Sequence, residues 1–215
     1  MDDDDGEDGV MAQAAATMAI AEFDAFVASV AEGKHFELFD GTPLLMSNPN
    51  ETHDQIAANI GANLKLAMDK RGCRTYQGGM MVQASAHSAG RDKFRPDIVV
   101  RCGPSGNNTF ITDPIIIAEV LLPSTLDRDR GPKLEFYKRL PTVQHIVLAY
   151  ADQMRVEHYV RIEDGWDLKV LPTPESTIEL DAVAFSIDLE TVYFDVPFDR
   201  APRAAARSEG SGHKV

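Results

Sequence analysis

The sequence predicts an α/β fold, with an α+β type of mixed sheet, in which helices flank a central mixed β-sheet. Two β-branched runs, at 97–102 and 114–122, are typical of strands buried on both faces in the middle of a sheet. Residues 51–70 repeat apolar side chains at helical spacing. The chain has 215 residues, 44% of them hydrophobic, which is enough for one substantial core. We therefore expect a single folded domain over 11–198.

The N-terminal part begins with a tail and continues into a helix and a hairpin. Residues 1–10 are mostly acidic and have little to bury, so they are predicted to be a disordered tail. Residues 17–31 place apolar side chains on one helical face. Residues 36–39 and 43–46 read as two strands of a hairpin, because the Asp-Gly pair between them suits a tight turn.

The middle of the chain is expected to alternate helices and strands. The helix over 51–70 should end at Gly72, and short strands follow at 73–77 and 80–84. After the two buried strands, a helix of about ten residues should begin near Asp129, with the following proline tolerated in its first turn. Helices placed in this way would cover the buried strands.

The last third is predicted to be mostly strand. Expected strands cover 145–150, 154–161 and 166–171, and a short helix at 189–194 closes the domain. Residues 199–215 are predicted to be a disordered C-terminal tail. No run reaches the ~18 apolar residues that a membrane-spanning helix needs, so no membrane association is expected.

The cysteine content argues for a reducing compartment. Cys73 and Cys102 are too few for a disulfide framework or a Cys-rich zinc site, and both are expected to be buried free thiols. The Ala-rich stretch 10–21 follows acidic residues, the opposite of the basic start of a secretory signal. The sequence therefore predicts a soluble, cytoplasmic protein.

The charge balance limits the kinds of partner. The chain carries 21 Lys and Arg against 34 Asp and Glu, a net charge of −13, which excludes a histone-like binder that relies on bulk positive charge. Residues 91–139 are different, with nine bases against seven acids. An anionic partner would have to be bound locally, around this stretch. The chain has no GxxxxGK(S/T), HExxH, CxxC or GxSxG motif, so NTPase, zincin, zinc-ribbon and α/β-hydrolase functions lack support.

Two acidic residues stand in apolar strands. Asp97 begins one predicted buried strand, and Glu119 lies near the end of the next. A carboxylate in such surroundings needs a cation, a proton or hydrogen bonds. On adjacent strands the pair favours Mg²⁺ or Mn²⁺, with the Val120 carbonyl as a third oxygen donor. Acids surrounded by bases are what a metal-dependent phosphodiester-cleaving enzyme requires.

Six motifs, in this order along the chain, resemble the Uma-two family, whose members are classed as candidate restriction endonucleases of the PD-(D/E)xK nuclease superfamily. The resemblance covers residues 17–195. The motifs are FELFDG (36–41), SNPNETHDQI (47–56), RPDIVV (95–100), IAEVLLPST (117–125), DRGPKLEFYKRL (129–140) and HIVLAY (145–150).

The resemblance implies a restriction-endonuclease-like αβββαβ core and a set of site residues. Asp97 matches the metal-binding Asp of the superfamily, and Glu119 matches its (D/E)xK acid. Glu37 matches an acid that many members place near the metal. The pattern's Lys is missing, because residue 121 is leucine. The family resembles members in which this Lys has moved to the following helix, where Lys133 stands.

The resemblance also implies a function and substrate contacts. It implies an endonuclease that hydrolyses DNA with Mg²⁺ or Mn²⁺, and a homodimer would suit cutting both strands. Two alternatives remain open: a catalytically silent nuclease-fold protein that acts as a dimeric binding or regulatory module, and a nuclease directed at RNA. The candidate substrate-binding residues are Arg95, Ser124, Arg130, His53 and Tyr137.

Each site residue also has an ordinary structural interpretation. Asp97 could cap the start of a strand, and Glu119 could be a structural acid paired with a buried Arg. Lys133 could be an exposed helix lysine, and Glu37 a solvent-facing strand acid. His53 could belong to a polar first turn that stabilises its helix.

Overall fold

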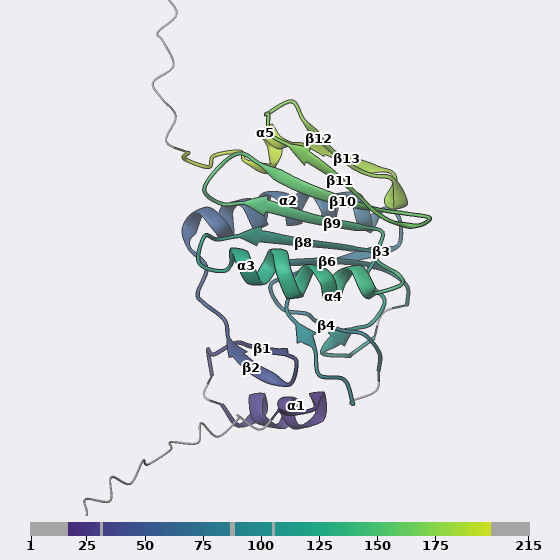
Figure 1. The fold of residues 1–215 in the computed structure, drawn as a ribbon. Coiled ribbons are helices and arrows are strands. Elements are labelled where there is room, and N and C mark those ends of the chain that lie inside the picture. The colour runs from purple at the N-terminus through teal and green to yellow at the C-terminus, as the bar shows by residue number, and fades with distance from the viewer. Residues whose placement is uncertain (1–16, 31, 87–88, 105, 199–215) are drawn as a thin grey trace, which may run out of the picture. The chain divides into compact units, whose positions relative to one another are not determined.

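The computed structural model describes residues 17–30, 32–86, 89–104 and 106–198 (Figure 1). Both predicted tails, 1–10 and 199–215, lie outside the described residues. Contacts divide the chain into two compact units, each described below by itself. The first is Met1–Asn48, Met80–Arg95 and Asn108–Thr112; the second is Pro49–Gly79, Pro96–Asn107 and Asp113–Val215. One independently folding domain over 11–198 stays a prediction.

The first unit is a five-stranded sheet with one helix. Apolar residues of α1 (Ile20–Ser29) pack with β-strand side chains in a small core that contains Ile20, Phe23, Leu38 and Met81. All neighbouring strands are antiparallel except the parallel pair β4 and β7. The strands, in spatial order, are β2 (Thr42–Leu45), β1 (Phe36–Phe39), β5 (Lys93–Phe94), β4 (Met81–Gln83) and β7 (Phe110–Ile111).

The predicted hairpin is confirmed. Strands β1 and β2 pair antiparallel, with Phe39 opposite Thr42. The two turn residues Asp40 and Gly41 have φ values of 42° and 76°. Positive φ at both central positions is the geometry of the two-residue turn that matches strand twist, and Asp-Gly is among the sequences that adopt it most readily.

The second unit contains a six-stranded mixed sheet. Only β8 and β9 are parallel; the other neighbouring pairs are antiparallel. The strands, in spatial order, are β11 (Gly165–Leu171), β10 (Val156–Ile162), β9 (His145–Tyr150), β8 (Ile116–Leu121), β6 (Ile98–Cys102) and β3 (Cys73–Gln77). Because β8 and β9 run parallel, the chain between them must cross over, and it does so through a helical segment.

Helices cover the two faces of this sheet. On one face α2 (Glu51–Asp69) packs over Ile116, Ala118 and Val120 of β8, in one continuous core. On the other face lies the segment α3 (Leu126–Arg128), η1 (Asp129–Lys133) and α4 (Leu134–Arg139) (Figure 1). Side chains alternate between faces along a strand, so Glu119 points toward this second layer. The mixed α/β fold with flanking helices is thus confirmed.

The C-terminal part of the second unit adds a small hairpin that was not predicted. β12 (Thr177–Leu180) pairs antiparallel with β13 (Phe185–Asp188), and the short helices η2 (Asp181–Val183) and α5 (Leu189–Val192) follow β12 and β13 respectively. The side chain of Asp188 caps α5 by accepting a hydrogen bond from the Thr191 N–H at 2.7 Å. Ile178 and Leu180 alternate with polar residues, which is a strand pattern, and both are buried.

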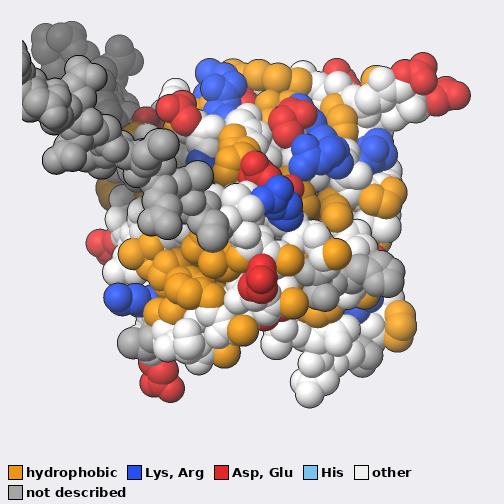
Figure 2. Space-filling view, turned by 60° about the horizontal axis from the view of Figure 1, so that its bottom comes forward, with side chains coloured by type: hydrophobic (Ala, Val, Ile, Leu, Met, Phe, Trp, Pro, Cys, Tyr) orange, Lys and Arg blue, Asp and Glu red, His pale blue; other side chains and the backbone are white. Residues whose placement is uncertain are grey.

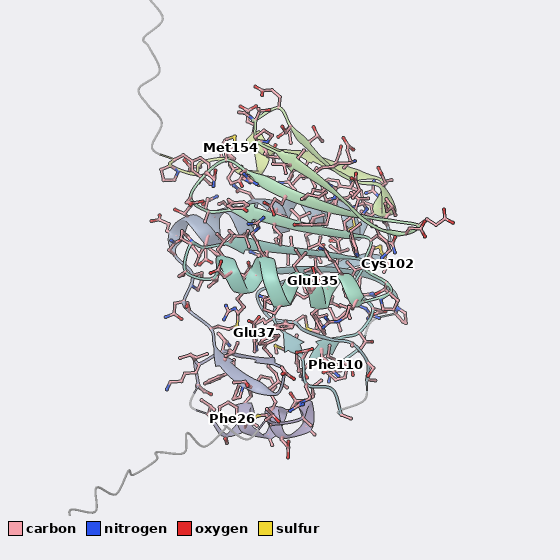
Figure 3. The ribbon with its side chains drawn as sticks, viewed as in Figure 1. Phe26, Glu37, Cys102, Phe110, Glu135 and Met154 are labelled. Carbon is pink, nitrogen blue, oxygen red and sulfur yellow. A yellow bond between two sulfur atoms is a disulfide. The ribbon has the colours of Figure 1, made fainter. Side chains whose placement is uncertain are left out.

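The expectation of two free thiols is wrong. Cys73 and Cys102 form a disulfide, and the described residues include no free cysteine. The two residues are directly opposite each other in the antiparallel pair β3 and β6, with their Cα atoms 4.1 Å apart. Figure 3 labels Cys102 at the end of β6. Composition alone does not reveal that a pair of cysteines shares one register position.

Within the described part of the chain, no helix is both long enough and apolar enough to cross a bilayer.

Candidate nuclease site

Asp97 is held at the start of β6 by contacts from two other elements. Its Oδ2 accepts a hydrogen bond from the Val120 N–H of β8 at 2.7 Å and lies 3.2 Å from Nε2 of His53. Burial alone would raise the pKa of Asp97, but the His53 hydrogen bond and charge, the Val120 N–H and the Lys133 charge bring the pKa below its ordinary value. The carboxylate is therefore ionised in this site.

His53 is positioned by the first turn of α2. The side chain of Asn50 caps the helix by accepting from the His53 N–H at 2.9 Å. Its ring nitrogens lie 3.3 Å from Asp54 Oδ1 and 3.2 Å from Asp97 Oδ2. Burial alone would lower the pKa of His53, but the two carboxylates raise it above its ordinary value. His53 thus stands in a polar, capped first turn, as its structural interpretation expects, and also contacts Asp97; its role toward substrate stays a prediction.

Glu119 faces the α4 layer from the middle of the sheet. The residue is only 3% exposed. Its Oε1 accepts a hydrogen bond from the Tyr137 hydroxyl at 2.6 Å and lies 2.8 Å from Nζ of Lys133. A buried cation does compensate Glu119, and that cation is the lysine on the following helix. Charge-assisted bonds of this length are among the stronger hydrogen bonds in proteins.

Lys133 is buried, so the interpretation as an exposed helix lysine is wrong. The residue is 2% exposed, and its Nζ lies 3.4 Å from Asp129 Oδ1 as well as close to Glu119. Asp129 and Lys133 are four residues apart, so they lie on the same side of the helical segment. Two buried acids therefore share this one ammonium group.

An interrupted helix brings Lys133 to the sheet. Residues Asp129–Lys133 (η1) join α3 to α4 across a kink, at which Gly131 has a non-helical backbone (φ −100°, ψ −107°). Pro132 lacks the N–H that a regular turn would use. The helical segment begins at Leu126, three residues before the predicted start, and the interruption falls directly before α4.

The donor set suits a hard divalent cation. The Asp97 carboxylate accepts a hydrogen bond from the N–H of the peptide bond between Glu119 and Val120. This hydrogen bond brings Asp97 next to the backbone of Glu119. Carboxylate and carbonyl oxygens are the donors that Mg²⁺ and Mn²⁺ prefer. Among the described residues, no group of three or more His, Cys, Asp or Glu side chains is arranged to hold a metal. A metal here would thus rely on two carboxylates, the Val120 carbonyl and water.

Glu37 and Arg95 lie together in the first unit. The Glu37 carboxylate is fully buried, and its Oε1 accepts a hydrogen bond from the Arg95 N–H at 2.9 Å. Glu37 is labelled on β1 in Figure 3. Burial lowers the pKa of Arg95, and the Glu37 charge opposes that change. Burial contradicts the interpretation of Glu37 as a solvent-facing strand acid. Its role beside a metal, and that of Arg95 toward substrate, stay predictions.

The remaining candidates differ in their surroundings. Tyr137 is fully buried and binds Glu119, so it belongs to the wall of the site. Ser124 is exposed in the turn after β8. Arg130 is exposed on η1, where its Nε lies 3.1 Å from Glu157 Oε2. The second unit thus brings Asp97, Glu119, Val120, Lys133, His53 and Tyr137 into one connected site.

Sequence reasoning missed two acids of this layer. Asp129 contacts Lys133, but no apolar pattern in the sequence leads up to it. Only its spacing of four residues to a lysine could have indicated this contact. Glu157 is 1% exposed and interacts with Arg130, Arg155 and Tyr150. In the sequence, Glu157 stands between apolar and polar residues of β10 in the same way as an exposed strand acid. The sequence alone therefore does not indicate that it is buried.

Comparison with known proteins supports the fold and assigns the family. The model of the Uma2 family, described as "Putative restriction endonuclease", matches residues 20–190. The chain belongs to the Uma2 family. The match contains all of the candidate site residues named above, so the resemblance noted in the sequence motifs is confirmed.

Two further proteins and one solved structure are similar to this chain. Two uncharacterized proteins of Synechocystis sp. are similar: slr1290, 26% identical over 167 residues (77% of this chain and 86% of that protein), and sll1609, 26% identical over 148 residues (66% and 82%). The fold is similar to that in "Crystal structure of a putative nuclease belonging to DUF820 from Anabaena variabilis ATCC 29413", with a TM-score of 0.66 and 15% identity over 82% of this chain and 97% of that one. This likeness shows that the two chains share a fold.

Proposed function

We propose that this Uma2 protein is a metal-dependent endonuclease that hydrolyses phosphodiester bonds of DNA. The observation that carries the proposal is the buried Lys133 ammonium, 2.8 Å from Glu119 on the strand next to Asp97. This is the acid, acid and lysine set of the PD-(D/E)xK pattern, with the lysine supplied by the helix.

In the proposed hydrolysis, each site residue has its own role. Asp97, Glu119 and the Val120 carbonyl would hold Mg²⁺ or Mn²⁺, which supplies Lewis-acid polarisation of the phosphate and a lower pKa of bound water. Lys133 orients the attacking water and stabilises the negative charge that develops on the phosphate oxygens. Tyr137 and Asp129 keep the lysine and Glu119 in place. His53 fixes the orientation of Asp97.

Local cations, rather than the whole surface, would bind the DNA backbone. On the face shown in Figure 2, Lys and Arg side chains (blue) stand among Asp and Glu (red) and form no broad basic surface. With a net charge of −13, affinity for a polyanion depends on a few well-placed cations. We infer modest, salt-sensitive binding. The second candidate function, a silent binding module, rests on two observations: Leu121 stands where the pattern has its lysine, and the chain is acidic.

Cleavage of supercoiled plasmid tests the proposed function. Wild-type protein with Mg²⁺ or Mn²⁺ at low salt is expected to produce nicked circles, and EDTA should stop the reaction. Glu119→Ala, purified identically, should lose nicking by a factor of about 100 or more, the scale of removing one electrostatic stabiliser. Absence of nicking by both proteins, with Mn²⁺ still bound by the wild type, contradicts the DNA endonuclease and favours the silent binding module or a nuclease directed at RNA.

We propose that the dimer predicted from the sequence forms through β11. This strand is one of the two edges of the six-stranded sheet and, among the described strands, pairs only with β10. Leu168 and Val170 are each 45% exposed. In an antiparallel pair of two copies centred on Leu168, Asp167 would face Lys169 of the partner subunit. Opposite charges directly across an antiparallel pair stabilise it, and open edges invite such pairing.

Charge reversal tests this edge. Asp167→Lys would place two lysines opposite each other at both ends of the two-fold pair, so the dimer dissociation constant should rise about tenfold, the sum of two cross-strand pairs. The double variant Asp167→Lys/Lys169→Asp restores the pairing and should restore the dimer. Sedimentation equilibrium measures both. A dimer that is equally stable in all three proteins, or a monomeric wild type, contradicts the β11 interface.

A further inference from the structure

A second buried carboxylate lies on the same face of the sheet as Glu119. Glu157 of β10 is 1% exposed, and its Oε1 accepts hydrogen bonds from the Tyr150 hydroxyl and the Arg155 guanidinium, each at 2.9 Å. Its Oε2 lies 3.1 Å from Arg130 Nε and 3.4 Å from the Tyr159 hydroxyl. The pKa of Glu157 lies below its ordinary value: burial would raise it, but these donors and charges lower it.

The register places this cluster beside the candidate nuclease site. Glu119 is opposite Leu148 in the parallel pair of β8 and β9, and Leu148 is opposite Glu157 in the antiparallel pair of β9 and β10. The two acids therefore lie in one row across the sheet, two strands apart, which is about 10 Å. The helical segment reaches both acids: Lys133 contacts Glu119, and Arg130 contacts Glu157.

The cluster has more positive charge than a buried acid needs. One carboxylate faces two arginines, so the group carries a net charge of +1. The two arginine side chains remain partly exposed, Arg130 by 43% and Arg155 by 36%, although both form an ion pair with the buried Glu157. The Arg155 guanidinium also lies over the Tyr150 ring, 5.1 Å from its centroid. An arginine that is fixed at one end and open to solvent is suited to bind a phosphate with its planar fork.

We propose that Arg155, together with Arg130, binds a second phosphate of the same nucleic-acid strand whose scissile phosphate lies at Glu119 and Lys133. The inference rests on the proposed function and adds a substrate requirement to it. Successive phosphates of one strand advance by about 3.4 Å along a duplex axis and also rotate about it, so two phosphates about 10 Å apart are at most about three nucleotides apart. The site would thus select a polynucleotide over a mononucleotide. Glu157 acts as the positioning residue that holds both arginines.

Binding measured without cleavage tests this subsite. Wild type and Arg155→Gln are titrated with a fluorescein-labelled oligonucleotide duplex in Ca²⁺, by fluorescence anisotropy at several salt concentrations. Loss of one phosphate contact should weaken binding about tenfold and reduce the slope of log K against log salt by about 0.9. The matched control is Lys65→Gln, which also removes one positive charge but lies on α2, the helix that covers the other face. This control should change neither quantity.

A second variant separates charge from geometry. Arg155→Lys keeps the charge but not the planar fork, so it should bind more weakly than wild type with an unchanged salt slope. Urea unfolding checks that each variant is folded; if Arg155→Gln is not, Arg155→Lys carries the comparison.

The results distinguish this proposal from the one it rests on. Equal affinity and equal slope for wild type and the Arg155 variants would make the cluster purely structural and overturn the subsite, even if plasmid is nicked. A wild type that binds through Arg155 yet never nicks contradicts the nuclease alone. A wild type that binds no oligonucleotide overturns both proposals.

Discussion

Lys133→Met is expected to abolish plasmid nicking and to lower the free energy of unfolding by about 3–5 kcal/mol, the usual cost of removing one partner of a buried ion pair. Methionine keeps the length of the side chain but removes the ammonium group between Glu119 and Asp129. Both acids would then remain in a site where Lys133 itself is only 2% exposed. Urea denaturation and the plasmid assay measure the two effects.

A double variant separates the effect on stability from the effect on catalysis. Lys133→Met/Glu119→Gln removes the ammonium and one of the two acid charges that it neutralises, so part of the lost stability should return, while Asp129 stays charged. Tyr137 still has an oxygen to donate to. Nicking should not return, because the lysine is absent and the metal-binding acid is neutral. A folded Lys133→Met protein that nicks at the wild-type rate would remove Lys133 from the proposed mechanism.

Acidification from pH 7 to pH 5 is expected to destabilise the protein by about 2 kcal/mol through His158 alone. The side chain is fully buried, with its Nε2 3.1 Å from Nδ1 of His145, whose own Nε2 accepts from the Ala182 N–H. Burial, the neighbouring His145 and the charge of Lys169 lower the pKa of His158 to about 3. Burial also lowers the pKa of His145; Lys169 adds to this effect, and Asp181 opposes it.

The sign follows from which state binds the proton. Between pH 6.5 and about 3, the unfolded chain protonates His158 and the folded protein does not. The stability that the neutral ring contributes is therefore complete above pH 6.5 and is lost progressively as the pH falls below it. Urea midpoints at pH 7, 6 and 5 measure the loss. The control His145→Gln/His158→Gln has no ionisable ring in the pair, so its stability should fall less; an identical fall would show that other groups are responsible.

Much of the fold was predictable because local patterns were strong. The β-branched run of β8 is buried at every position, as predicted for a central strand. Glu119 was recognisable for the same reason: a single acid in an apolar strand needs a partner wherever the strand lies. The helical spacing of α2 and the Asp-Gly turn before β2 depend on neighbours within a few residues. Predictions of that kind do not depend on the rest of the molecule.

Other features depend on residues that are distant in sequence. Lys133 is a buried cation because η1 lies over β8. The helical pattern of the sequence does not reveal this position. The disulfide exists because β3 and β6 place Cys73 and Cys102 opposite each other. The link between Asp97 and the Glu119–Val120 peptide likewise needs the pairing of β6 with β8.

The sequence by itself determined the order of the main helices and strands, the family, and the three residues Asp97, Glu119 and Lys133 as candidates. Only the tertiary structure decided which charges neutralise one another: Lys133 with Glu119 and Asp129, His53 with Asp97, and two arginines with Glu157. The physical reason is that the cost of burying a charge depends on what lies within a few ångströms of it. Strand pairing sets that surrounding, and composition or periodicity does not.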